Sequence, residues 1–412
     1  MNVPATSSES AAQRANQRNA VLAGFLGWTF DAFDFFILTF VLAPVAKEFH
    51  RSIPEIALTL TASLAMRPVG AFLFGLMADR YGRRLPLMLD ILFYSVIELL
   101  SGLAPNYTIF FFLRLLYGIG MGGEWGVGAS LVLESVPAKW RGILSGVLQE
   151  GYALGYLLAA VAYFNVFPHW GWRPMFFLGA LPALLSLFIR AKVKEPEAWH
   201  RSRTDWATYR RSVFQNWQRF LYLVALIAVM GFISHGTQDL YPTYLQQQRG
   251  FNPKMTSLIT IVSMVGAMVG GIVVGLYSDR HGRRRAMLTA VGLALLLIPL
   301  WVFAPSVSLI FAGAFLMQFM VQGAWGVIPA HLNELSPDQL RGFFPGLAYQ
   351  LGVLCASSAP YLEALMSAHM SYGQAMGIFA AVAFVGTILV IAPGPEAHRV
   401  VFGQGETKSR SG

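Results

Sequence analysis

The sequence predicts an all-α integral membrane protein with twelve transmembrane helices, arranged as two pseudo-symmetric six-helix bundles. Its composition is 55% hydrophobic and only 12% charged, whereas a soluble domain has about 25% charged residues. The mean hydropathy is accordingly positive, at +0.53. The 412 residues leave room for twelve apolar segments of about 20 residues joined by short loops.

An internal repeat supports the division into two bundles. The stretch Gly70–Arg84 (GAFLFGLMADRYGRR) returns as Gly270–Arg284 (GGIVVGLYSDRHGRR). The same shift, without a gap, aligns four later sites: Trp125-Gly126 with Trp325-Gly326, Glu134 with Glu334, Pro137 with Pro337, and Arg141-Gly142 with Arg341-Gly342. A register kept over about 70 residues indicates two copies of one unit.

Twelve apolar runs define the expected spans. They lie at 20–46, 55–78, 86–104, 107–133, 141–166, 172–191, 219–246, 255–278, 286–304, 307–333, 342–367 and 371–393. The expected domains are a cytoplasmic tail over 1–19, a bundle over 20–191, a cytoplasmic linker over 192–218, a bundle over 219–394 and a cytoplasmic tail over 395–412. Both tails are polar and are expected to be disordered. The linker is expected to be an amphipathic surface segment.

The basic residues predict the orientation. Most of the 30 Lys and Arg residues fall in the tails, the linker and the loops on the N-terminal side of the membrane. Arg67 and Arg114 lie within spans, and the opposite side holds only Lys47, Arg51, Arg173, Arg249 and Lys254. Both termini are therefore expected in the cytoplasm, with the chain in a cytoplasmic (inner) or plasma membrane. Because the basic residues do not form one cluster, the net charge of +9 does not indicate nucleic-acid binding.

The repeated stretch combines residues with distinct physical uses. Gly70 and Gly75 allow another helix to approach closely. Asp79 ends the apolar run, where its carboxylate suits the positive N-terminal end of a neighbouring helix. Gly82 permits a tight turn, and Arg83 is expected in water. A plain positive loop is the alternative, but the same residues recur in both halves.

This stretch resembles the short cytoplasmic loop motif of the major facilitator superfamily, and the superfamily resemblance covers nearly the whole chain. In that family the loop latches the inward side shut by pairing with charged residues at nearby helix ends. The resemblance implies a cytoplasmic gate made of Asp79, Arg83, Glu134 and Arg141 in the first half, and Asp279, Arg283, Glu334 and Arg341 in the second. It also implies a monomer.

Polar residues within the expected spans are costly and usually mark a pathway or a pair. Asp31 and Asp34 lie three residues apart and share one helix face. Further polar residues in the spans are Arg67, Glu98, Arg114, Glu124, Gln149, Glu150, Gln318, Gln322 and Gln350. The alternative interpretation is that these groups only hold helices together, and it stays open for Glu98, Gln318 and Gln322.

Two kinds of chemistry are available among these residues. An arginine can hold an anionic substrate through charge-assisted hydrogen bonds, and an acid among other acids can exchange a proton near neutral pH. We expect Arg67 or Arg114 to bind a carboxylate and the other to pair with Glu124 or an aspartate. Asp31 and Asp34 are the preferred proton-coupling pair, because two acids on one face share protons readily.

The seventh expected span carries a run of polar residues: Ser234, His235, Thr237, Gln238, Asp239 and Thr243. The run resembles the signature of the sialate:proton symporter branch, best represented by fungal lactate permeases, although Gly231 replaces its asparagine. The DAFDFF stretch of the first span is also similar to that branch. The resemblance implies roles in proton coupling and substrate recognition for His235 and Asp239. Sialate carriers of the branch have two extra central spans, so the short linker here favours the small-monocarboxylate members.

The expected function is secondary active transport, as proton-coupled symport of a small monocarboxylate such as lactate or pyruvate by alternating access. The candidate substrate-binding residues are Arg67, Arg114, Glu124, Gln149, His235, Gln238 and Gln350. The candidate proton-coupling residues are Asp31, Asp34, Glu124, His235 and Asp239. The expected partners are a small carboxylate, protons and the lipid bilayer.

Three alternatives differ in what they require. A proton-coupled carrier of a larger organic acid, sialate or aromatic, is the nearest, and the signature around His235 argues against the aromatic-acid branch. A membrane enzyme needs a nucleophile–base pair or a metal cluster, and neither is visible in the sequence. A ligand sensor needs a soluble signalling domain, for which no segment is long enough. We expect no cofactor and no metal, and the lone Cys355 excludes a disulfide within the chain.

Overall fold

The computed structural model describes residues 7–51, 53–202, 206–367, 369–396, 400 and 402, and the regular elements among them are all helices. In the first half they are α1 (Ser7–Glu48), α2 (Ile53–Tyr81), α3 (Arg84–Gly102), α4 (Tyr107–Ser135), η1 (Ala138–Trp140), α5 (Arg141–Gln149), α6 (Gly151–Trp170), α7 (Arg173–Leu178) and α8 (Ala183–Lys192). The linker contains α9 (Glu197–Ser202) and α10 (Trp206–Gln215). The second half contains α11 (Trp217–Gln238), α12 (Tyr241–Gln247), α13 (Pro253–His281), α14 (Arg283–Val302), α15 (Val307–Leu335), η2 (Asp338–Leu340), α16 (Phe344–Ala356), α17 (Ala359–Ser367) and α18 (Tyr372–Ile391).

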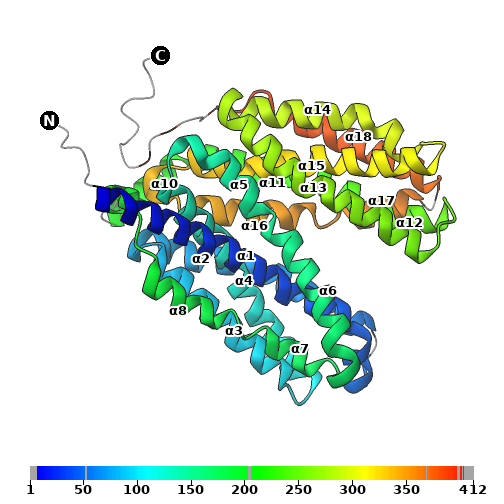
Figure 1. Cartoon of the computed structure of the whole chain (residues 1–412), viewed down its shortest axis with the longest axis horizontal. Coiled ribbons are helices and arrows are strands. Elements are labelled where there is room, and N and C mark those ends of the chain that lie inside the picture. The colour runs from blue at the N-terminus through cyan, green and yellow to red at the C-terminus, as the bar shows by residue number, and fades with distance from the viewer. Residues whose placement is uncertain are drawn as a thin grey trace.

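The helices form two groups, which Figure 1 separates by colour. The group from α1 to α8 is drawn in blue to green, and the group from α11 to α18 in yellow-green to red. The groups lie against each other at the end where α1 begins and α10 lies, and they diverge towards the opposite end. We call the joined end the motif face, because Asp79 and Asp279 contact the opposite half there. The other end is called the far face.

Ten helical stretches among the described residues are long and apolar enough to cross a membrane. Each coincides with one of the predicted spans. The other two predicted spans are α4, which carries Arg114, Glu124 and a run of glycines, and the pair α16 and α17. The helical content and the position of these segments therefore fit the predicted twelve-span architecture.

Four of the predicted spans are divided into two helices, and the first span is kinked at Val41, whose backbone is not helical. The breaks separate α5 from α6, α7 from α8, α11 from α12, and α16 from α17. Pro182 directly precedes α8, and α12 has a proline in its first turn. Proline lacks a backbone donor and fits the first turn of a helix but not its interior, which explains why a new helix begins at these two places.

Two of the breaks divide a span between the halves. On the motif face, α5 packs against α13 and α15, and α16 packs against α2 and α4, so both cross to the opposite half. Beyond the breaks, α6 packs against α1 and α7, and α17 packs against α11 and α18, within their own halves. The repeat-related helices α5 and α16 thus join the halves, while the main helix contacts of α6 and α17 lie within their own halves.

Glycines allow the close helix crossings, as the sequence predicted for Gly70 and Gly75. A Cβ at Gly70 would overlap the backbone of α4, and a Cβ at Gly75 would lie 2.8 Å from the carbonyl oxygen of Gly342 in the other half. A Cβ at Gly126 would lie 2.5 Å from the Cα of Gly346. The φ angle of Gly82 is 100°, so the predicted tight turn is present.

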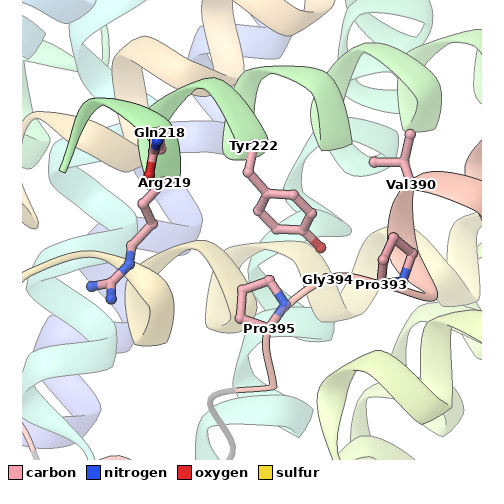
Figure 2. A pocket seen from close by; sticks show the side chains of 7 residues that line it. All are labelled: Gln218, Arg219, Tyr222, Val390, Pro393, Gly394 and Pro395. Carbon is pink, nitrogen blue, oxygen red and sulfur yellow. The ribbon is translucent and has the colours of Figure 1, made fainter.

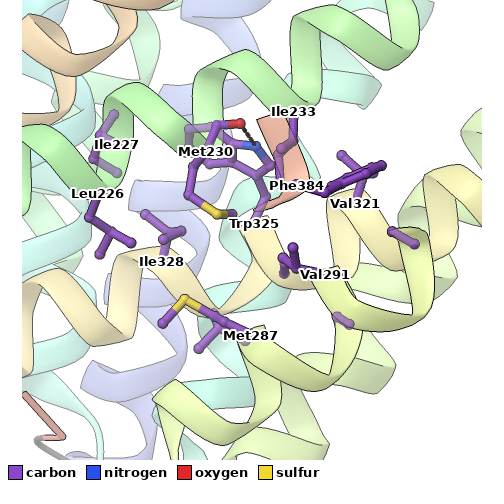
Figure 3. Close-up of a cluster of buried hydrophobic side chains, with 14 of the residues drawn as sticks. Leu226, Ile227, Met230, Ile233, Met287, Val291, Val321, Trp325, Ile328 and Phe384 are labelled. Atoms are coloured by element: carbon purple, nitrogen blue, oxygen red, sulfur yellow. Dashed lines mark hydrogen bonds between the residues drawn. The ribbon is translucent and has the colours of Figure 1, made fainter. Parts of the chain in front are cut away.

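A large apolar core holds the second half together (Figure 3). Met230 of α11 and Ile328 and Trp325 of α15 are buried in it, beside Met287 of α14. The indole nitrogen of Trp325 donates a hydrogen bond of 3.0 Å to the carbonyl oxygen of Met230. This core fixes the position of α11, which carries the signature residues.

Both tails differ from the expected disorder wherever the structure describes them. Residues 7–18 are helical and continuous with the first span, and Asn16 accepts a hydrogen bond of 2.8 Å from the backbone nitrogen of Lys194 in the linker segment. Phe402 is buried, although most of the C-terminal tail lies outside the described residues. Contacts with neighbouring polar groups therefore stabilise parts of both tails that the composition alone predicts to be disordered.

Candidate functional site

The first loop motif forms a buried network that reaches the second half. One terminal nitrogen of Arg83 lies 2.8 Å from Asp79, and the other lies 2.8 Å from Glu134. The Asp79 carboxylate accepts hydrogen bonds from the backbone nitrogens of Gly342, at 2.6 Å, and Phe343, at 3.1 Å. These nitrogens precede α16, so Asp79 faces the positive end of that helix.

The second loop motif repeats this network towards the first half. Arg283 lies 2.8 Å from Asp279 and 2.9 Å from Glu334. The Asp279 carboxylate accepts from the backbone nitrogens of Gly142, at 2.9 Å, and Ile143, at 3.1 Å. Each half therefore holds the start of the crossing helix of the other half.

Arg83 is buried, not in water as predicted. Burial disfavours its charged guanidinium, but the carboxylates of Glu134 and Asp79 outweigh burial and raise the pKa of Arg83. A paired and hydrogen-bonded cation of this kind is strongly destabilised when one partner is removed. The loop is thus a structural junction between the halves.

The remaining two predicted gate residues make other contacts. The Nε of Arg141 donates a hydrogen bond of 3.0 Å to the carbonyl oxygen of Leu133. The Nε of Arg341 donates one of 3.2 Å to the carbonyl oxygen of Asn333. Arg341 pairs with Asp338, and Arg141 lies 3.9 Å from Glu334 of the other half. The guanidinium carbon of Arg141 lies 3.3 Å from the ring centre of Phe402, and that of Arg341 lies 3.6 Å from the same ring centre. The expectation that each arginine joins its own half's motif is therefore corrected.

The sequence reasoning missed residues that support both loops. Glu195 accepts hydrogen bonds from the backbone nitrogens of Arg83 and Arg84, and Glu396 accepts from those of Arg283 and Arg284, both at 3.0 Å. The two glutamates are related by a shift of 201 rather than 200, so an ungapped comparison does not align them. An acidic residue beside a proline at the end of each half was the available signal.

The linker also contacts the first loop. The Tyr209 hydroxyl donates a hydrogen bond of 3.2 Å to the Asp79 carboxylate. The Trp199 indole nitrogen donates one of 2.9 Å to the backbone carbonyl oxygen of Asp79. Both contacts come from the linker, which occurs only once in the chain. Burial and the nearby Asp79 charge raise the pKa of Tyr209, which keeps the hydroxyl as a donor.

Four buried carboxylates lie together in the interior of the first half. Asp31 and Asp34 of α1, Asp90 of α3 and Glu124 of α4 are fully buried, and none of their side-chain oxygens has a hydrogen-bond partner among the described residues. Asp31 interacts electrostatically with Asp34 and with Glu124. A Cβ at Gly27 would overlap the Glu124 carboxylate, so this glycine makes room for it.

Arg114 pairs with Glu98, not with Glu124 or an aspartate as predicted. The short loop between α3 and α4 brings these two positions to the same depth. The guanidinium of Arg114 also lies 4.1 Å from the ring centre of Tyr117, and Arg114 is only 1% exposed. Arg114 thus has a carboxylate and an aromatic ring as partners, although its Nε has no hydrogen-bond partner among the described residues.

Arg67 is in a different situation. Its Nε and Nη2 have no hydrogen-bond partner among the described residues. Its charge interacts with Asp31 and Glu124 and with the tyrosines Tyr152 and Tyr349. The α2 backbone at Arg67 runs against Gly122 of α4, so the arginine is held in place by a close helix crossing.

Aromatic side chains from both halves meet beside Arg67. Trp125 stacks on Tyr349 with ring centres 4.0 Å apart, and Trp28 contacts Tyr152 and Tyr349 at 5.7 and 6.4 Å. The two predicted glutamines lie close by. Gln149 accepts from the indole nitrogen of Trp125 at 3.4 Å, and Gln350 donates to the carbonyl oxygen of Gly122 at 3.4 Å. The predicted site residues Arg67, Glu124, Gln149 and Gln350 are therefore brought together.

The signature residues of α11 form a second group. His235 and Asp239 lie 3.0 Å apart, and both side chains are about one-third exposed, at 37% and 33%. Gln238 donates to Gln318 of α15 at 2.8 Å, so both glutamines connect helices. A cavity of about 30 Å³ adjoins this contact.

Two other signature positions can be accounted for. Gln322 donates to Ser234 at 3.0 Å, which adds a second contact between α15 and α11. Gly231 packs against Ala356, where even a Cβ would overlap, so the asparagine of the signature has no room here. The side chain of Thr243 lies outside the described residues.

A separate surface pocket of about 290 Å³ opens at the motif face (Figure 2). It is lined by Gln218, Arg219, Tyr222, Val390, Pro393, Gly394 and Pro395. Figure 2 shows Tyr222 of α11 beside the turn that follows α18. None of the predicted site residues lines this pocket, so it is distinct from the interior site.

Fold and site together define a membrane carrier of two related helical halves, joined at one face and carrying buried ionisable groups. Residues 24–260 and 240–411 match the family model of the Major Facilitator Superfamily. The chain belongs to this superfamily, and it is a multi-pass membrane transporter rather than an enzyme. The predicted superfamily and fold class are thereby confirmed.

Relatives and solved structures agree with this assignment. The chain is 31% identical over 388 residues to the sialic acid transporter NanX of Escherichia coli, covering 92% of this chain and 94% of NanX. It is 29% identical over 373 residues to a carboxylic acid transporter protein homolog of Saccharomyces cerevisiae, covering 84% of this chain but only 60% of the yeast protein. The proton:xylose symporter XylE shares the fold, with a TM-score of 0.76 at 18% identity over 95% of this chain and 98% of that chain.

Proposed function

We propose that the protein is a proton-coupled symporter of a small monocarboxylate such as lactate or pyruvate. One observation carries the proposal. Arg67 has two unpartnered donor nitrogens and lies within electrostatic range of Asp31 and Glu124, whose carboxylates have no partner among the described residues. A cation for the substrate and acids for the proton therefore occupy one site. The similarity to a yeast carboxylic acid transporter homolog supports the substrate class.

Arg67 is the substrate ligand in this proposal. Arg114 already uses its guanidinium on Glu98, whereas Arg67 keeps donors available. A hydrogen bond that involves a charged group contributes about 1.5–3 kcal/mol, and an arginine can make two to one carboxylate. The rings of Trp28, Tyr152 and Tyr349 surround the site and favour a compact substrate.

The proton binds to the aspartate pair. Asp31 and Asp34 are adjacent on one face of α1 and interact with each other. An uncompensated charge inside the membrane is costly, and a proton bound together with a monocarboxylate anion adds no net charge. The loaded site can therefore cross the membrane more easily than a site that carries the anion alone.

Alternating access follows from the symmetric junction. The positive-inside rule assigns the motif face to the cytoplasm, and the hydrogen bonds of Asp79 and Asp279 to the opposite half support a role as the gate that closes this face. Release into the cytoplasm requires these carboxylates to leave the start of α16 and of α5. The two halves then rock about the central site, which lies between them.

The test is uptake of labelled lactate into proteoliposomes with an inward proton gradient, with and without a protonophore. The proposal predicts accumulation that collapses when the protonophore is added. Empty liposomes and Arg67→Gln proteoliposomes are the matched controls, and both should show only leakage. Absence of accumulation by folded wild-type protein would contradict the proposal.

A larger organic acid, such as sialate, is the second candidate. The similarity to NanX favours this candidate, because the aligned region covers 94% of that sialic acid transporter. The short linker therefore does not separate the two substrate classes, contrary to the expectation from extra central spans. Competition decides between them: excess sialate should leave lactate uptake unchanged if the substrate is a small monocarboxylate, and should suppress it if both acids share the site.

A further inference from the structure

The second half contains a buried acid that neither the predicted site nor the proposed mechanism uses. Glu363 lies in α17, is fully buried, and has no hydrogen-bond partner for either carboxylate oxygen among the described residues. A buried polar group is normally hydrogen-bonded, because burial without a partner is costly. An acid that holds helices together would have a donor beside it. Glu363 therefore needs another explanation.

The surroundings of Glu363 place it next to the signature helix. A Cβ at Gly236 would lie 3.5 Å from one Glu363 carboxylate oxygen, so the acid packs against α11 at the small residue between His235 and Asp239. Gly236 and Asp239 are three residues apart and share that face. Glu363 interacts electrostatically with Asp239, which is itself paired with His235 at 3.0 Å.

Few other ionisable groups face this acid. Helix α17 packs against α11 and α18, and α18 contains no Asp, Glu, Lys, Arg or His. Helix α11 and its C-cap contribute His235 and Asp239, and Arg219 lies at the opposite end of α11. The described part of α17 carries no other acid or base. Among the described residues of these helices, no lysine or arginine is therefore positioned to neutralise Glu363, and the charged group that interacts with it is Asp239.

We propose that Glu363 is a proton-binding residue of the second half, loaded through the His235–Asp239 pair. His235 and Asp239 are about one-third exposed and Glu363 is fully buried, so the three residues lead from the surface into the interior. A proton taken up by the imidazole or by Asp239 passes to the Glu363 carboxylate, which becomes a neutral carboxylic acid. Unloading reverses these steps and restores the carboxylate.

This site is separate from Asp31 and Asp34, which lie in the other half. It deepens the proposed proton coupling and rests on that function, because a second proton-binding carboxyl changes how many protons the carrier holds. It also gives the histidine and aspartate of the signature a role that does not require contact with substrate. The acid lies in α17, the part of its span that stays with its own half.

The test is infrared difference spectroscopy of the purified protein after a pH step, without substrate. The C=O stretch of a protonated carboxylic acid reports each buried acid that changes its protonation. We expect Glu363→Gln to lose one component of this band, and Glu363→Asp to keep that component at a shifted frequency. A band that is unchanged in both variants would overturn the proposal.

Two comparisons keep this test independent of folding and of transport. Asp31→Asn should remove a different component and leave the Glu363 component in place. The shifted band in Glu363→Asp shows directly that the acid titrates in a folded protein, and an unshifted band in this variant counts against the proposal. Because no substrate is present, failure of lactate uptake would refute the proposed function while leaving the infrared result to decide on Glu363.

Discussion

The two halves can be compared position by position at the shift of 200 residues. At the motif face Asp79, Arg83 and Glu134 make the contacts that Asp279, Arg283 and Glu334 make in the other half. In the interior the ionisable residues of the first half have no counterpart. The positions of Arg67, Glu98, Arg114 and Glu124 are occupied by Ala267, Ile298, Ala314 and Ala324.

The difference also runs in the other direction. His235, Asp239 and Glu363 of the second half correspond to Phe35, Thr39 and Tyr163 of the first. A junction that must open and close around a pseudo-twofold axis requires the same contacts from both halves. Substrate and proton binding have no such requirement. The comparison therefore separates residues of the moving junction from residues of the chemistry.

The largest expected effect distinguishes the two interior arginines. Arg114→Gln leaves Glu98 as an unpaired buried charge, which costs about 3–5 kcal/mol of folding free energy. Arg67→Gln removes a cation of which two donor nitrogens, Nε and Nη2, are unpartnered among the described residues, so it should destabilise the fold much less than Arg114→Gln while abolishing lactate binding. Thermal unfolding in detergent checks the first statement. Equal destabilisation by the two substitutions would contradict the distinction.

The next effect concerns the acid pair. Asp31→Asn or Asp34→Asn should abolish proton-driven accumulation and leave part of the substrate exchange intact, because the anion ligand Arg67 remains. Ser234→Ala, at the position that corresponds to Asp34, is the matched control and should keep accumulation. The measurement is uptake and counterflow in proteoliposomes. Full accumulation in both aspartate variants would show that the coupling acids lie elsewhere.

A smaller effect tests the symmetry of the junction. Asp79→Ala and Asp279→Ala each remove two hydrogen bonds to the start of a crossing helix, worth about 1.5–3 kcal/mol each as charge-assisted bonds. Both should increase the labelling of cysteines introduced at the motif face. The exposed Cys355 must first be replaced by serine. An effect of one substitution without the other would break the comparison.

The smallest effect tests the contact between the linker and Asp79. Tyr209→Phe removes only the hydroxyl that donates to Asp79, a loss of about 0.5–1.5 kcal/mol. Labelling at the motif face should therefore rise less than in Asp79→Ala. The phenyl ring keeps the packing, so the variant isolates the hydrogen bond. A change as large as that of Asp79→Ala would mean that the linker, rather than the symmetric loops, holds the face closed.

Much of this architecture follows from the sequence. Periodic apolar runs and the repeat predict the spans, and the recurrence of Asp79 and Arg83 predicts paired loops. Hydropathy does not predict where a span breaks, because α5 and α6 are joined by Glu150 without a proline. The Arg114–Glu98 pair depends on how α3 and α4 align. The sequence alone does not show this alignment, so it does not tell which arginine pairs with Glu98.

Two omissions had signals that were available. Glu363 is an ionisable residue inside a predicted span, the same feature that identified Asp31, but it lies near the end of its span. Glu195 and Glu396 escaped because one residue is inserted between the repeats before the second glutamate. Their contacts with the loop backbone depend on the path of the chain after the last helix of each half, which composition does not specify.

The most direct measurement of the central account is calorimetric titration of the purified transporter with lactate in two buffers of different ionisation enthalpy. The difference between the two heats gives the protons taken up on binding. The account predicts proton uptake with lactate in the wild type, no binding in Arg67→Gln, and binding with reduced proton uptake in Asp31→Asn or Asp34→Asn. Lactate binding by Arg67→Gln, with unchanged proton uptake, would contradict the assignment of substrate and proton to this site.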